Sequence, residues 1–157
     1  MNPVASASRV LVVGPDHLLR NRLVTVAART AHAEGCPTFK AARVCIENTP
    51  YDLIVTDARL SEYNGLHLVY LAKFANAAAR AIVYDREGDP GIAADVHHAG
   101  AFFEAVPRLI VTLPSYIAAT LPAADRRSLL AFDRRAYPRG GRRLWDRHLL
   151  EHPAQMA

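Results

Sequence analysis

Residues 9–16 read Arg9-Val10-Leu11-Val12-Val13-Gly14-Pro15-Asp16, and this stretch begins the pattern that decides the fold. An unbroken run of valine and leucine is typical of a strand that is buried on both faces of a sheet. Gly14 and Pro15 then end the strand, and Asp16 is a residue type that caps the first turn of a helix. The stretch therefore predicts a buried strand at 9–13 and a helix that begins at Asp16.

The same alternation of apolar runs and helical stretches continues along residues 8–120, which predicts one doubly wound α/β domain with a parallel sheet. The functional crevice of such a sheet lies at the carboxyl ends of its strands, where Asp57, Asp85 and the Gly14-Pro15 turn are expected. The predicted strands are 9–13, 35–39, 52–56, 80–84 and 102–106, and the predicted helices are 16–31, 40–48, 65–78, 91–99 and 108–120.

Residues 121–157 differ in composition and are expected to form an arginine-rich, partly helical extension. The chain has a formal net charge of +4, and this extension carries all of it, with eight arginines against four acidic residues. Short helices are expected at 123–136 and 142–151. Arginine clusters can grip phosphates, so Arg139, Arg142 and Arg143 are candidate contacts to nucleic acid. Alternatively, the arginines of this extension pair with its own aspartates in solvent.

Several functional classes are disfavoured by composition and motifs. No apolar run approaches the ~20 residues that a membrane-spanning helix needs, so no membrane partner is expected. Cys36 and Cys45 are the only cysteines, no secretory segment is recognised before them, and a reduced, cytoplasmic protein is expected. The sequence has neither a Gly-x-Ser-x-Gly elbow nor a glycine-rich phosphate cradle, which argues against an enzyme.

Four segments together resemble the receiver domain of bacterial two-component response regulators. They are Val10-Leu11-Val12-Val13, Tyr51-Asp52-Leu53-Ile54-Val55-Thr56-Asp57, Asn64-Gly65-Leu66 and Ala99-Gly100-Ala101. The resemblance covers residues 8–120 and implies a flavodoxin-like, five-stranded parallel sheet with the strand order 2-1-3-4-5. It also implies that Asp57 stands at the phosphoacceptor position.

The family's other phosphate-handling residues are replaced in this chain. The two acids that would hold Mg²⁺ after the first strand read Gly14 and Pro15, and the hydroxyl residue after the fourth strand reads Asp85. The lysine before a proline reads Val106-Pro107. A carboxylate attacks a phosphoryl group poorly without a cation, so we expect a site that lacks both metal and positive charge.

Three interpretations of Asp57 remain open from the sequence. It can be a polar residue at a strand end, with Asp16 serving only as a helix cap. It can be phosphorylated in spite of the replaced neighbours. Finally, Asp57 and Asp85 could share a proton or, together with Asp16, hold a hard cation such as Mg²⁺.

The leading hypothesis is an atypical receiver that binds other proteins independently of phosphorylation; the partner would be a histidine kinase, another regulator or a second copy. The alternatives are a phosphorylatable single-domain regulator with an altered metal site and a transcription-associated regulator that binds nucleic acid. In the family, the fourth helix, fifth strand and fifth helix form the docking face. In this chain that face would include His97, His98, Phe102, Arg108, Leu109, Leu113 and Tyr116, although Leu109 and Leu113 could instead fill the core.

Overall fold

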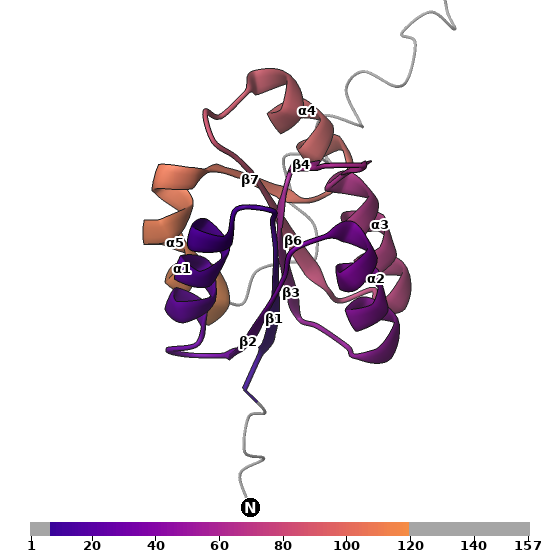
Figure 1. The fold of residues 1–157 in the computed structure, drawn as a ribbon, viewed down its shortest axis with the longest axis vertical. Helices are drawn as coiled ribbons and strands as arrows, with labels where there is room; N and C mark the ends of the chain where they lie inside the picture. The colour runs from indigo at the N-terminus through magenta and orange to yellow at the C-terminus, as the bar shows by residue number, and fades with distance from the viewer. Residues whose placement is uncertain (1–6, 120–157) are drawn as a thin grey trace, which may run out of the picture.

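The computed structural model describes residues 7–119 and contains a five-stranded parallel sheet in the order β2-β1-β3-β6-β7. In chain order this is 2-1-3-4-5, so the predicted doubly wound fold is confirmed (Figure 1). The sheet consists of β1 (Arg9–Val13), β2 (His32–Cys36), β3 (Leu53–Asp57), β6 (Arg80–Asp85) and β7 (Phe102–Ala105). The helices are α1 (His17–Ala27), α2 (Phe39–Asn48), α3 (Leu66–Ala75), α4 (Pro90–His98) and α5 (Val106–Ala118).

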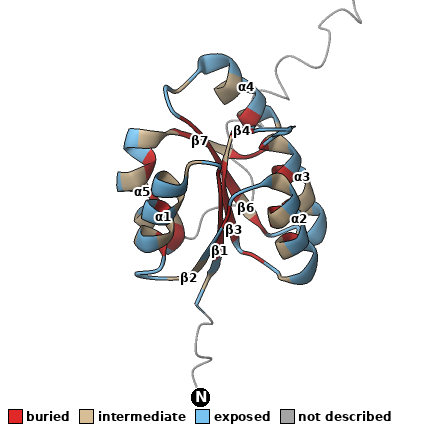
Figure 2. Cartoon of the chain, in the orientation of Figure 1, coloured by how far each residue is buried: buried red, intermediate tan, exposed pale blue. Residues whose placement is uncertain are grey.

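The helices cover both faces of the sheet: α1 and α5 pack together on one face, while α2 and α3 pack on the other (Figure 1). Successive strand residues point to opposite faces, and β1 follows this rule. Val10 and Val12 belong to the apolar cluster under α1 and α5, whereas Leu11 and Val13 belong to the cluster under α2 and α3. Figure 2 shows the central strands as the buried layer between exposed helix surfaces.

The first helix begins where the sequence predicts. Asp16 lies in extended backbone just before α1, and its Oδ1 accepts hydrogen bonds from the backbone N–H groups of Leu18 and Leu19 at 3.0 and 3.1 Å. Capping in this geometry satisfies donors that have no partner within the helix. The prediction that Asp16 is an N-cap is therefore confirmed.

The second strand starts three residues earlier than the predicted 35–39. The first helix ends at Ala27 instead of continuing to residue 31, and the chain turns so that His32 N–H donates to the Ser8 carbonyl at 2.9 Å. His32 to Cys36 then pair with Arg9 to Val13. This strand lies at the sheet edge and exposes polar residues, so its sequence lacks the apolar pattern of the central strands.

A small antiparallel hairpin between β3 and α3 was not predicted. It consists of β4 (Arg59–Leu60) and β5 (Tyr63–Asn64), and Ser61 in its turn has a positive φ of 33°. Two-residue strands are too short to produce a recognisable alternation in sequence. The hairpin is important because it directly follows Asp57 and positions Arg59.

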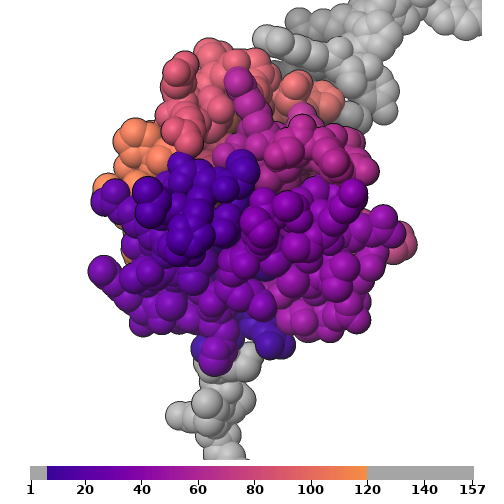
Figure 3. All heavy atoms as spheres, in the orientation of Figure 1, coloured from indigo at the N-terminus to yellow at the C-terminus, as the bar shows by residue number. Residues whose placement is uncertain are grey.

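In the space-filling view, atoms of α1 and of the β2–α2 segment lie side by side on the visible face (Figure 3). Within residues 7–119, no helix combines the length and the apolar character needed to cross a membrane. The predicted extension at 121–157, its two helices and its candidate contacts Arg139, Arg142 and Arg143 lie outside the described residues. The domain boundary at residue 120 stays a prediction.

Candidate functional site

A hollow of about 570 Å³ lies at the carboxyl ends of the central strands, where the sequence predicts the site. It is lined by Pro15, Asp16, Asp57, Arg59, Asp85, Arg86 and Glu87. A larger hollow of about 720 Å³ lies at the opposite end of the sheet, near Ala7, Arg9 and Asp52. That second hollow contains no predicted site residue, so the carboxyl-end hollow is the candidate site.

Asp57 is the last residue of β3 and is half-buried. Its Oδ1 accepts a hydrogen bond from the Arg59 backbone N–H at 2.8 Å. Burial is the main reason that the pKa of Asp57 is raised above its usual range, and the nearby negative charge of Asp85 adds to the rise. The hydrogen bond from Arg59 and the positive charges of Arg86 and Arg59 offset part of this effect.

Asp85 ends the neighbouring strand β6 and is more deeply buried, but its pKa is lowered. Burial by itself would raise that pKa; however, hydrogen bonds from the backbone N–H groups of Asp89, Glu87 and Arg86 stabilise the carboxylate more strongly. Arg59 Nε lies 3.9 Å from Asp85 Oδ1 and adds a favourable charge. The pKa values of the two carboxyl groups are thus shifted in opposite directions, and Asp57 takes up a proton before Asp85 as the pH falls.

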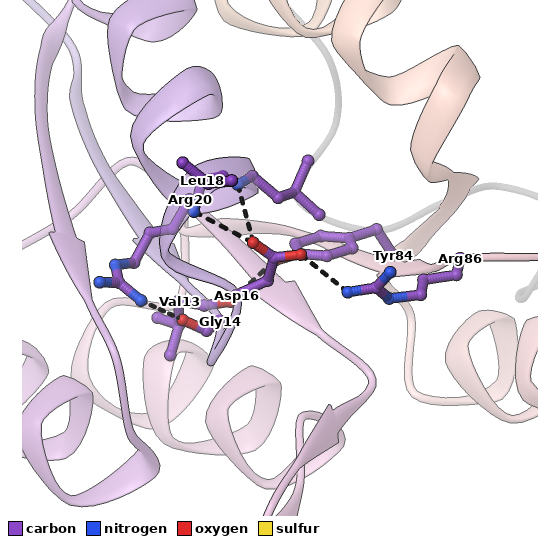
Figure 4. A network of polar contacts seen from close by, with 8 residues as sticks. Val13, Gly14, Asp16, Leu18, Arg20, Tyr84 and Arg86 are labelled. Atoms are coloured by element: carbon purple, nitrogen blue, oxygen red, sulfur yellow. Dashed lines mark hydrogen bonds and ion pairs between the residues drawn. The ribbon is translucent and has the colours of Figure 1, made fainter.

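Asp16 is engaged on both of its carboxylate oxygens, as Figure 4 shows. One oxygen caps α1, and the other accepts a hydrogen bond from Arg86 Nη2 at 2.7 Å. The pKa of Asp16 is lowered chiefly by the backbone N–H of Leu19, and Arg86 contributes further. The arginine thus joins the start of α1 to the loop after β6 across the hollow.

Tyr84 occupies the space next to Gly14. The tyrosine is buried in β6, and its hydroxyl donates to the Val13 carbonyl at 3.3 Å (Figure 4). A Cβ built on Gly14 would overlap the Tyr84 hydroxyl, although it would lie at ordinary contact distances from Tyr84 Cζ (3.6 Å) and Asp57 Cβ (3.7 Å). No side chain fits at position 14 unless the tyrosine moves, so the acid expected there from the family resemblance is excluded sterically as well as by sequence.

The expectation of a site without positive charge is wrong, because Arg59 and Arg86 line the same hollow as Asp57. The sequence reasoning missed Arg59, Arg86 and Glu87, which line the hollow, and Tyr84, which packs beside Gly14. In the sequence, Arg59 follows Asp57-Ala58 and Arg86 follows Asp85. Because both strand ends were predicted, these positions indicated that the two arginines lie near the site. Val106 and Pro107 begin α5 and do not line the hollow, and Gly14 is buried beneath it.

The lining residues do not fit a Mg²⁺ ion. Magnesium takes oxygen ligands in near-octahedral geometry, usually one or two carboxylates together with several waters. Here Asp16, Asp57 and Asp85 each accept hydrogen bonds from nitrogen donors, and two guanidinium groups stand among them. Within residues 7–119, no group of three or more His, Cys, Asp or Glu side chains is arranged to hold a metal ion.

The predicted docking face is only partly available on the surface. Leu109 and Leu113 are both 0% exposed and pack in the core beneath α1 and α5, so their assignment as partner contacts is wrong. They sit at the spacing of four that gives α5 its buried face. The remaining residues of this group, His97, His98, Phe102, Arg108 and Tyr116, are partly or fully exposed.

Part of that face is organised around the buried Glu104 of β7. Tyr116 donates its hydroxyl to Glu104 Oε1 at 2.8 Å, and Arg108 Nε lies 3.3 Å from Oε2. The Phe102 ring meets the Tyr116 ring edge-on at a centroid distance of 5.5 Å. Side chains of β7 and α5 on this face are therefore held in position by one buried carboxylate.

Comparison with solved structures identifies the fold of known receiver domains. The beryllofluoride-activated NtrC4 receiver domain dimer matches with a TM-score of 0.59 and 22% identity, over 69% of this chain and 95% of that one. The CheY-like receiver domain protein from Methanospirillum hungatei JF-1 matches with a TM-score of 0.61 and 18% identity, over 71% and 94% of the chains. Chemotaxis response regulator CheY4 of Vibrio cholerae matches with a TM-score of 0.63 and 13% identity, over 71% of this chain and 99% of that one.

No protein-family model matches the sequence, and no curated protein matches it either. At identities of 22% and below, the structural matches establish the fold and leave the chemistry of the site to be argued from its residues.

Proposed function

We propose that this chain is an atypical response-regulator receiver that works by binding other proteins, without phosphorylation of Asp57 and without enzymatic activity. The observation that carries this proposal is the packing of the Tyr84 hydroxyl against Gly14, where an acidic side chain would otherwise contribute to a metal site. The Asp16–Arg86 ion pair supports it, because the nearest alternative carboxylate is already committed to an arginine and a helix cap.

Electrostatics in the hollow explain how such a site can be stable without a metal. Three carboxylates close together repel one another, and a divalent cation is the usual remedy. In this chain, Arg59 and Arg86 supply fixed positive charge between Asp16, Asp57 and Asp85. In this arrangement, two arginine side chains supply the positive charge that a bound metal ion would otherwise supply.

The surface proposed for partner binding is the exposed part of α4, β7 and α5, which includes His98, Arg108 and Tyr116 and excludes the buried leucines. Val111 of α5 adds a large apolar side chain that is 76% exposed. Beside the partly exposed aromatic rings of Phe102 and Tyr116, this side chain offers an apolar contact that a partner protein could bury. The partner would be a histidine kinase, another regulator or a second copy.

Complementation of a strain that lacks this gene tests the proposal. We expect Asp57→Asn to restore the phenotype, because it keeps the shape and the hydrogen bond to Arg59 but cannot be phosphorylated. We expect Val111→Glu to fail, although its exposed position leaves the fold intact by circular dichroism. Failure of Asp57→Asn in a folded protein, with normal activity of Val111→Glu, would contradict the proposal.

A second candidate function is favoured by the same two arginines. A phosphorylated Asp57 would gain charge-assisted hydrogen bonds from guanidinium groups, so Arg59 and Arg86 could replace a metal ion in a working phosphoacceptor site. A phosphodonor experiment separates this candidate from the first.

Nucleic-acid binding through Arg139, Arg142 and Arg143 remains a third hypothesis, which rests on the sequence of the extension alone. Contacts to phosphates release counterions, so binding to a labelled duplex should fall steeply with salt. No shift of the duplex at low salt would contradict it.

A further inference from the structure

The two cysteines of the chain lie beside each other away from the candidate site. Cys36 ends β2 and is buried, Cys45 lies in α2 and is partly exposed, and their Sγ atoms are 3.4 Å apart. A disulfide bond has a sulfur separation of about 2.05 Å, so the two atoms would have to approach by roughly 1.3 Å. The two sulfur atoms are already in contact, and a disulfide requires only this remaining approach.

The surroundings give the two thiols different roles. Burial, together with the hydrogen bond to Cys45, raises the pKa of Cys36 to about 12, so Cys36 stays protonated at neutral pH and attacks peroxide in solution only slowly. Cys45 is the thiol that solvent can reach. An oxidant entering from solution therefore meets Cys45 first, with Cys36 directly behind it.

We propose that Cys45 is a site of peroxide oxidation and that Cys36 resolves the product into an intramolecular Cys36–Cys45 disulfide. In the first step, the Cys45 sulfur attacks a peroxide oxygen, an S–O bond forms, the O–O bond breaks, and water leaves. In the second step, the Cys36 sulfur attacks Cys45 Sγ, the S–S bond forms, and the S–O bond breaks. The hydroxyl group departs as water with the proton of the Cys36 thiol, so one peroxide is reduced and two thiols are oxidised.

The disulfide would act on the backbone that supports the candidate site. The Cys36 carbonyl accepts a hydrogen bond from the Gly14 N–H at 3.1 Å, and the Gly14 carbonyl accepts one from Arg20 Nη1 at 2.6 Å. Joining Cys36 to α2 would hold this end of β2 in place and restrict the unfolded chain. The oxidised protein should therefore melt at a higher temperature than the reduced protein. This effect does not depend on whether Asp57 is phosphorylated.

The test treats the full-length chain with hydrogen peroxide, denatures it, alkylates it with iodoacetamide and measures its intact mass. We expect a monomer that has lost the mass of two hydrogen atoms and carries no alkyl group, and dithiothreitol should restore two alkylatable thiols. Omission of peroxide is the matched control. Three results would overturn the proposal: two alkylated cysteines after oxidation, sulfinic acid on Cys45 with Cys36 still alkylatable, or disulfide-linked dimers instead of the internal bond.

Single variants assign the two steps. Cys36→Ala lacks the resolving thiol, so the Cys45 sulfenic acid should accumulate and be trapped by dimedone. Cys45→Ala should leave Cys36 alkylatable after the same peroxide exposure, because the buried thiol is shielded. Oxidation of Cys36 in that variant, at the rate of the wild-type reaction, would contradict the assignment of Cys45 as the site of attack. If either variant does not fold, the wild-type mass measurement still decides the proposal.

Discussion

The contact between position 14 and Tyr84 can be measured with a double-mutant cycle of Gly14→Ala and Tyr84→Phe. In the wild-type background, the new methyl group overlaps the tyrosine hydroxyl, which the buried strand β6 holds in place. Forcing an extra methyl into a packed interior costs about 1–3 kcal/mol. Tyr84→Phe removes the clashing oxygen, and the nearest remaining ring atom is then Cζ, at 3.6 Å from the added Cβ.

The magnitude expected for the cycle follows from these distances. Tyr84→Phe alone loses one long hydrogen bond to the Val13 carbonyl, 3.3 Å, and should cost about 0.5–1.5 kcal/mol. Gly14→Ala should be destabilising in the wild type and close to neutral in the phenylalanine background. The entropic effect of replacing glycine in the unfolded chain is common to both backgrounds and cancels. The coupling free energy should therefore be about 1–3 kcal/mol.

Urea denaturation of the four proteins, followed by circular dichroism, measures the cycle. A similar destabilisation by Gly14→Ala in both backgrounds would refute the argument that the hydroxyl occupies the space of an acidic side chain. A neutral Gly14→Ala in the wild type would refute it as well, since it would mean that Tyr84 moves aside without cost.

Three further predictions concern the charged groups. Asp57→Asn should stabilise the protein at neutral pH, because burial and Asp85 raise the pKa of Asp57 and the folded state therefore favours the protonated acid. In urea titrations at a series of pH values, this gain in unfolding free energy should vanish as the pH falls below the ordinary carboxyl range. An equal gain at low pH would contradict this. Asp16→Ala should lower the urea midpoint more than Asp16→Asn, which keeps the cap and loses only the ion pair; equal effects would show that the cap contributes nothing. Tyr116→Phe should cost about 1.5–3 kcal/mol, because it removes a 2.8 Å hydrogen bond to the buried Glu104 carboxylate, and an unchanged urea midpoint would exclude that role.

Prediction from sequence succeeded where burial leaves a simple pattern. The central strands β1, β3 and β6 are buried along almost their whole length, so their apolar runs are unbroken and their positions could be predicted. The edge strand β2 has the burial pattern of a mostly exposed segment, and only its pairing with β1 defines it. Its predicted position was therefore displaced by three residues. The two-residue strands of the β4–β5 hairpin leave no periodic signal at all.

The site was predicted at the correct end of the sheet, but its charge balance was not. Asp57 and Asp85 could be placed because each follows a buried strand. The role of Tyr84 depends on the register of the parallel strands, which aligns Tyr84 with Asp57 and brings its hydroxyl next to Gly14. This register could not be predicted from the one sequence. Arg59 reaches the hollow from the short strand β4 and Arg86 from the loop after β6, and neither geometry can be read from the sequence. Leu109 and Leu113 were placed on the docking face, with the core left open as the alternative, and their burial bears out the alternative.

Under the proposed function, Asp57 does not accept a phosphoryl group in this site. The most direct measurement is the intact mass of the full-length chain after incubation with acetyl phosphate and Mg²⁺, with Asp57→Asn treated in parallel and a phosphorylatable receiver as the positive control. We expect an unchanged mass for both the wild type and the Asp57→Asn variant. An added phosphoryl group on the wild type that the Asp57→Asn variant lacks would contradict it.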